Sequence, residues 1–216
     1  TSPATKEVRS RMVSPSARAT RIVPALLLAS LALAACDDAP PTVGLDAALD
    51  GPLQPTDTAA SALRESEIVG LLISSNEGQI AEGELAQRLG ADPRVRTFGA
   101  TMVSMHTASN ARLVDLRMRL GIKPEVSPLG QMLTDDVDAT RAALAAFTGA
   151  AFDRAYAAAQ VRQHGRLLDV VNSALVPNAT SPELRDALTR DVATMEAAHV
   201  EQARALTPPK SLRKHA

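Results

Sequence analysis

The sequence contains one cysteine, no tryptophan, one tyrosine and three phenylalanines. A single cysteine has no partner within the chain for a disulfide. Few aromatic side chains are available for the base stacking on which single-strand binding relies. Lysine and arginine together number 23 against 24 aspartates and glutamates, so the excess of positive charge that nucleic acids attract is also missing. We therefore expect no nucleic-acid partner.

Several enzyme signatures are absent as well. The sequence shows no nucleophile elbow around a serine, no glycine-rich phosphate loop and no Cys-x-x-Cys-His segment for covalent haem. The sequence therefore identifies no reaction, and we expect a binding or envelope-maintenance module rather than an enzyme.

The longest apolar run begins at Ile22 and ends in Leu33, Ala34, Ala35 and Cys36. A basic lead-in, an apolar stretch shorter than a bilayer span and small residues before a cysteine are typical of a lipoprotein signal peptide. We interpret Leu33, Ala34 and Ala35 as the lipobox and Cys36 as the acylated first residue of the mature protein. The expected location is the bacterial cell envelope, lipid-anchored and facing the periplasm, with the choice between inner and outer membrane left open.

Composition divides the chain into four parts. Proline, aspartate and threonine dominate the segment after Cys36, which is typical of a flexible tether, and two prolines precede a short basic tail. The expected parts are a signal peptide at 1–35, of which 1–11 precede Met12 and are interpreted as non-natural, a lipid-anchored tether at 36–58, a helical domain at 59–207 and a basic tail at 208–216.

The domain is rich in alanine and leucine, its apolar residues recur every three or four positions, and no strand pattern occurs, which predicts an all-α fold. Asp92-Pro93 and Ser181-Pro182 are typical of helix starts, and Gly90 and Gly121 of helix ends. The expected helices span 66–89, 93–120, 129–147, 150–175 and 182–206. Four long helices predict an antiparallel four-helix bundle, with 129–147 as an additional short helix.

Heptad spacing predicts which side chains point inward, including Met105 in the second helix and Met195, His199 and Gln202 in the last. Several inward positions are polar and lie near helix midpoints. Because midpoints of antiparallel helices meet at one level, we expect these side chains to converge. They are Gln79, His106, His164 and His199.

Three segments carry a resemblance to a known family: NEGQIAEGELA at 76–86, FGATMVSMHTASNARL at 98–113 and GAAFDRAYAAAQVRQH at 149–164, together with the late His199. Over 66–206 the chain resembles a bacterial family of exported, ferritin-like proteins of unknown function, also labelled predicted outer membrane proteins. The resemblance implies the ferritin-like bundle and no established reaction.

Ferritin-like di-iron sites need one glutamate from each of two helices and Glu-x-x-His from each of the other two. Glu196 and His199 fit Glu-x-x-His, but Val103 lies three residues before His106. We therefore expect no di-iron site. A single divalent transition ion such as zinc, copper or nickel can instead use His106, His164 and His199 with Glu196 or Glu82.

The alternative to a metal site is a core polar network that fixes the helix register. In it, the buried histidines bond to Gln79, Gln160, Tyr156 or Glu196. Tyr156 fills the core with its hydroxyl towards a polar partner, and Asp153 caps or charges the start of its helix. Convergence of the three histidines with a carboxylate favours metal binding, whereas dispersed or amide-paired histidines favour the network. A third alternative is a scaffold for an envelope protein partner, which needs an exposed apolar patch.

Replacing the lipobox cysteine tests the proposed anchor. Cys36→Ser is expected to release the mature domain from membranes, because the acyl chains have no other attachment point. Fractionation of cells into membrane and soluble protein measures this. Continued membrane association of Cys36→Ser would contradict the lipoprotein interpretation.

Overall fold

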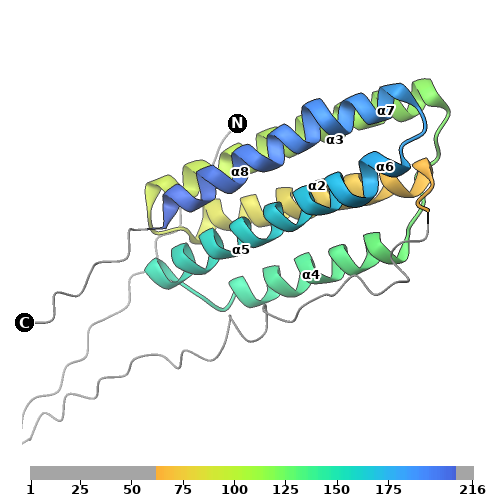
Figure 1. The fold of residues 1–216 in the computed structure, drawn as a ribbon. Helices are drawn as coiled ribbons and strands as arrows, with labels where there is room; N and C mark the ends of the chain where they lie inside the picture. Colours follow the sequence, from red (N-terminus) through yellow and green to blue (C-terminus); the bar gives the residue numbers. More distant parts are fainter. Residues whose placement is uncertain (1–61, 208–216) are drawn as a thin grey trace, which may run out of the picture. The chain divides into compact units, whose positions relative to one another are not determined.

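The structure is a computed structural model that describes residues 62–207 (Figure 1). Cys36, the lipobox, the tether 36–58 and the tail 208–216 lie outside the described residues. Residues 62–207 are helical and contain no strand, which confirms the all-α prediction. Within this range, no helix is both long enough and apolar enough to cross a membrane.

Residues 62–207 form five main helices, two of which continue through wide π-helical segments, labelled η. In chain order the elements are α2 (Glu65–Leu89), α3 (Pro93–Leu120), α4 (Pro128–Leu144), α5 (Gly149–Val170), η2 (Val171–Leu175), α6 (Val176–Asn178), α7 (Pro182–Asp186), η3 (Ala187–Val192) and α8 (Ala193–Leu206).

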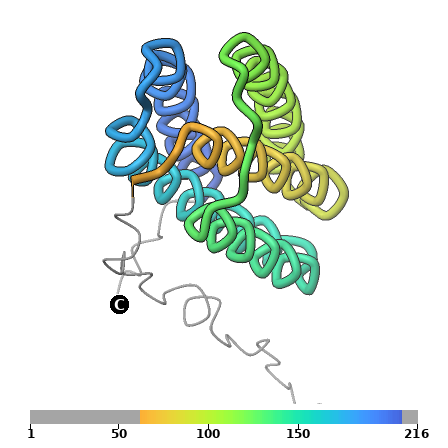
Figure 2. The backbone as a smooth tube through the Cα atoms, turned by 90° about the vertical axis from the view of Figure 1, so that its right-hand side faces the viewer, coloured from red at the N-terminus to blue at the C-terminus, as the bar shows by residue number. Residues whose placement is uncertain are grey.

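Helix α2 lies in the middle of the arrangement and packs against α3, α4 and α5, while α5 packs along α8 (Figure 2). Successive long helices run in opposite directions (Figure 1). Helices α2, α3, α5 and η3–α8 lie side by side, and the shorter α4 packs on the outside against α2. This arrangement brings the middles of four helices to one level.

Local sequence explains where the helices begin and end. The Asp92 carboxylate accepts a hydrogen bond from the Arg94 amide at 2.8 Å, and Pro93 takes the first helical position of α3. Gly121 adopts a left-handed conformation (φ 67°) that ends the same helix. Pro182 begins α7 as predicted, but the Ser181 side chain makes no capping hydrogen bond.

At two of the turns, a carboxylate from another helix also binds the amides just before a helix begins. Glu65 at the start of α2 accepts hydrogen bonds from the amides of Thr180 (2.9 Å) and Ser181 (2.6 Å), ahead of α7. Asp153 near the start of α5 likewise accepts from Ala91 and Asp92, both at 2.9 Å, ahead of α3. Asp153 therefore makes its hydrogen bonds to the turn ahead of α3, where Asp92 is the N-cap, and it lies outside the core polar network in which we expected it. Backbone N–H groups at a helix start have no acceptor within the helix, so a carboxylate from any part of the chain can stabilise them.

Two expected inward positions point outward. Met105 is 41% exposed, because the next residue, His106, turns inward in its place. In α8, Gln202 is exposed and Ala203 is buried. Met195 and His199 earlier in the helix are buried as expected, so this difference lies near the end of α8.

Helices α2 and α3 approach closely where two glycines face each other. A Cβ atom at position 99 would lie 2.6 Å from the carbonyl oxygen of Gly83 and 2.8 Å from the Cβ of Ala86. Because neither glycine has a Cβ atom, the backbones of the two helices can approach closely at this point.

Gly99→Ala is therefore expected to destabilise the fold by about 1 to 3 kcal/mol, because the added methyl group forces the backbones apart. Gly165→Ala is the matched control, since a Cβ there meets nothing within 4 Å. In the control, alanine's helix propensity is expected to leave stability unchanged or raise it by up to about 1 kcal/mol. Urea unfolding followed by circular dichroism measures both, and equal effects would contradict the close-packing argument.

Candidate functional site

A layer of polar side chains divides the core into two apolar clusters. One cluster surrounds Ile68, Leu116 and Leu188, and the other surrounds Phe98 and Phe152. Helices α2, α3, α5 and α8 all contribute to the polar layer, whose members are 0 to 5% exposed. They are Asn76, Gln79, Glu82, His106, Ser109, Gln160, Gln163, His164, Glu196 and His199.

Three histidine rings meet at the centre of this layer. The ring centroids of His106 and His164 are 5.6 Å apart, those of His106 and His199 5.1 Å, and those of His164 and His199 4.9 Å. Each ring comes from a different helix, and each is at most 1% exposed. The three histidines therefore converge, as expected from their positions near the helix midpoints.

The ring of His106 is oriented by Asn76. Its Nδ1 lies 2.7 Å from the Asn76 Oδ1, which can only accept a hydrogen bond. The Asn76 amide is fixed in this orientation because its Nδ2 donates to Asn110 Oδ1 at 2.8 Å and to Ser109 Oγ at 3.2 Å. His106 therefore carries its proton on Nδ1 and has a free lone pair on Nε2.

The ring of His164 lies between Gln160 and Glu196. Gln160 donates from Nε2 to Glu82 at 2.6 Å, so its Oε1 accepts from His164 Nε2 at 3.1 Å. The other ring nitrogen, Nδ1, lies 2.6 Å from Oε2 of Glu196. If His164 is neutral and Glu196 ionised, two lone pairs face each other there. A proton or a cation must therefore satisfy this contact.

Further buried atoms of the same group have no hydrogen-bond partner among the described residues. They are Nε2 of His106, Oε1 of Glu196 and Nδ1 of His199. An unsatisfied buried polar atom is costly, and three at one place require an explanation such as an ion.

The spacing of these groups suits one metal ion. One potential ligand atom from each of His106, His164, Glu196 and His199 lies within 4.8 Å of the others. Ligands of a tetrahedral zinc ion lie about 3.3 Å apart, given metal–ligand bonds of about 2.0 to 2.1 Å. These side chains must therefore move closer together when an ion binds.

Glu82, the other carboxylate considered as a ligand, is not part of this group. Its two oxygens accept hydrogen bonds from Gln160 (2.6 Å) and Gln163 (2.9 Å) on α5. Burial raises the pKa of Glu82 to about 7, although the hydrogen bond from Gln163 acts in the opposite direction. Glu82 therefore reaches His164 only through Gln160.

The remaining polar residues named from the sequence have separate roles. Gln79 Nε2 lies 3.5 Å from Oε1 of Gln163, and its own Oε1 has no partner among the described residues. Tyr156 stacks on Phe152, with ring centroids 5.7 Å apart, but its buried hydroxyl likewise has no partner in the described part of the chain. The expected polar partner of the Tyr156 hydroxyl is thus not found there.

Sequence reasoning missed Asn76, the residue that sets the proton position on His106. A usable signal was present, because Asn76, Gln79 and Glu82 recur every three residues along one helix otherwise rich in apolar positions. Polar residues at such a spacing on a buried face indicate a network rather than a surface.

Burial keeps two of the histidines uncharged. It lowers the pKa of His106 to about 2, aided by His164 and His199, and lowers the pKa of His199 to about 3, aided by His164. Neutral imidazole is the form that binds metal ions. Both rings are therefore ready to act as ligands over the whole neutral pH range.

Acid is expected to destabilise the metal-free protein below pH 6.5, because the unfolded chain protonates His106 and His199 while the folded chain keeps them neutral to about pH 3. Each histidine removes up to about 1.4 kcal/mol per pH unit in this window. Glu82 acts oppositely between about pH 7 and 4.5, where the folded chain binds the proton first.

Urea unfolding at a series of pH values tests these opposed contributions. His106→Gln is expected to flatten the acid loss of stability, whereas Glu82→Gln is expected to steepen it between about pH 7 and 4.5. An identical pH profile for His106→Gln and the unchanged chain would contradict a neutral, buried His106.

Comparison with known proteins places the chain in a family. No curated protein and no solved structure matches it. The model of one family, described as a domain of unknown function (DUF4142), matches residues 51–206 and so includes every helix described above. This agrees with the family of unknown function expected from the sequence, while the ferritin-like and lipoprotein descriptions are taken up below as proposals. The chain is a member of the DUF4142 family.

Proposed function

We propose that this protein is a non-enzymatic metal-binding module that holds one divalent transition metal ion, with zinc as the best-fitting candidate. The proposed ligands are His106, His164, His199 and Glu196. The observation that carries the proposal is that His106, Glu196 and His199 each hold an unpartnered buried atom and form, with His164, one group whose potential ligand atoms lie within 4.8 Å of one another.

The ligand types favour zinc, and its close relatives copper and nickel, over iron. Three imidazoles and one carboxylate match borderline ions, whereas a pair of ferric ions needs more carboxylates than the one present in this group. All four ligands come from the protein and are at most 1% exposed. A tetrahedral ion would then have no position open for substrate, as in structural rather than catalytic zinc sites.

Hydrogen bonds outside the ligand group support the same function. Asn76 holds His106 with Nε2 free, and Gln160 holds His164 with Nδ1 directed at the group. Such outer partners fix ring orientation and usually change metal affinity by about 10 to 100-fold. Glu82 adds a second carboxylate at the far end of the Gln160 bridge.

The proposal also includes the type of helix bundle and the cellular location of this module. The helix arrangement supports a ferritin-like antiparallel four-helix bundle of α2, α3, α5 and α8, with α4 as the additional short helix. The signal-peptide pattern ending in Cys36 supports a lipid anchor in the bacterial envelope with the domain facing the periplasm. A scaffold role gains less support, because the large hydrophobic side chains exposed within 62–207 are Met105, Met118 and Val126.

Metal content of the purified chain tests the function directly. The full chain carrying Cys36→Ser, purified without chelators, is expected to contain about one zinc, copper or nickel ion by elemental mass spectrometry. The double variant His106→Ala/His199→Ala is expected to lose it. His215→Ala, which removes a histidine of the tail, is the control and is expected to keep it.

Thermal unfolding provides a second readout. Zinc at about 100 times its dissociation constant is expected to stabilise the metal-free chain by about 2.7 kcal/mol, and not to stabilise the double variant. A chain that contains no metal and whose melting temperature does not respond to zinc, copper or nickel would overturn the proposal.

A further inference from the structure

The proposed ligands are closed off from solvent, so an ion needs a route to them. His106 and His164 are 0% exposed, and Glu196 and His199 are 1% exposed. An ion that binds after folding must therefore pass between helices, and a cavity that adjoins the ligands marks the place.

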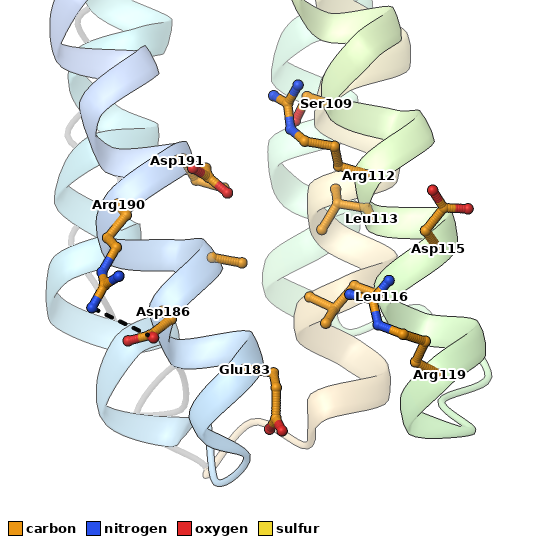
Figure 3. A pocket seen from close by; sticks show the side chains of 12 residues that line it. Ser109, Arg112, Leu113, Asp115, Leu116, Arg119, Glu183, Asp186, Arg190 and Asp191 are labelled. Atoms are coloured by element: carbon orange, nitrogen blue, oxygen red, sulfur yellow. Dashed lines mark ion pairs between the residues drawn. The ribbon is translucent and has the colours of Figure 1, made fainter.

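A cleft of about 520 Å³ lies between α3 and the α7–η3 segment (Figure 3). Its floor includes Leu113, Leu116 and Val192. Figure 3 shows Arg112 on the α3 wall and Asp191 on the η3 wall opposite. Charged side chains on both walls keep the cleft accessible to water and to hydrated ions.

The inner end of this cleft lies next to the ligand group. Ser109, which lines the cleft, is one helical turn from His106 on α3. Val192, which lines the opposite side, is four residues before Glu196. The two helices that form the cleft are thus the ones that supply His106, Glu196 and His199.

Two hydrogen bonds through Asn76 join the cleft-lining Ser109 to the proposed ligand His106. Asn76 Nδ2 lies 3.2 Å from Ser109 Oγ, and the same amide group accepts from His106 at 2.7 Å. Side-chain rotation of Asn76 would break both contacts together. This pair is therefore placed to separate the cleft from the ligands.

Other cavities are less suitable. A cavity of about 20 Å³ beside Gln79 and Gln163 adjoins the Glu82 side of the polar layer and offers room for about one water molecule. A cavity of about 250 Å³ lies between α2 and α4, which supply none of the four ligands.

We propose that the metal ion enters and leaves through the α3–η3 cleft, with the Asn76–Ser109 pair as the inner gate. The proposal rests on the metal-binding function above. It predicts that an obstruction in the cleft slows metal exchange without changing how many ions bind.

A bulky label tests the route. In the full chain carrying Cys36→Ser, Arg112→Cys is modified with a maleimide-linked polyethylene glycol, which places the polymer in the cleft mouth. Glu201→Cys, at an exposed position of α8 outside the cleft, receives the same label as the matched control. The metal-free proteins are mixed with Zn²⁺, and a chromophoric zinc indicator follows uptake.

The label at position 112 is expected to slow uptake by about tenfold or more while the final stoichiometry stays at one ion, and the label at 201 is expected to leave the rate unchanged. Asp191→Cys with the same label provides a second obstruction from the opposite wall, and circular dichroism checks that each protein is folded. Unchanged uptake rates with labels at both 112 and 191 would overturn the route alone. Failure of the unlabelled chain to take up Zn²⁺ would instead overturn the function, and the route with it.

Discussion

The physical constraint on which this structure depends is the need to satisfy polar side chains at the centre of an apolar core. A buried polar atom without a partner costs free energy, and a buried charge costs more. The fold meets this constraint by bringing polar groups from four helices to one level, where the amides of Asn76, Gln160 and Gln163 each bond to a histidine or a carboxylate. Three of the buried atoms that remain without a partner among the described residues belong to one group, on His106, Glu196 and His199.

Helix ends could be predicted from the sequence because their causes are local. Asp92 followed by Pro93 begins a helix, and a left-handed Gly121 ends it, whatever the rest of the chain does. The carboxylates that bind the backbone amides of the turns could not be predicted in this way. Asp153 accepts a hydrogen bond from the amide of Asp92, 61 residues earlier in the chain, a contact that exists only after α5 has packed beside the first hairpin.

The convergence of His106, His164 and His199 could be predicted because it follows from the level of helix midpoints. Which carboxylate joins the histidines could not be predicted. Glu82 and His106 are both buried, yet the direction in which each side chain leaves its helix sends Glu82 to the amides of α5 and His106 to the centre. Apolar residues spaced by three and four positions identify the buried face of a helix. They do not show which of two adjacent residues near the edge of that face points inward. Met105 and His106 are such a pair.

The wide turn of η3 connects the ligand set to its proposed access route. Leu184, Leu188 and Val192 are buried and recur every four residues through η3, and the buried positions that follow include Met195, Glu196, His199 and Ala203. The heptad pattern predicts Met195, His199 and Gln202 inward; Met195 and His199 are buried, whereas Gln202 is exposed and Ala203 is buried in its place. Glu196 lies on the same buried face, four residues after Val192. Since Ala187, Arg190, Asp191 and Val192 of η3 line the cleft and α8 continues directly from this segment to Glu196 and His199, one continuous helix supplies a wall of the opening and two of the proposed ligands.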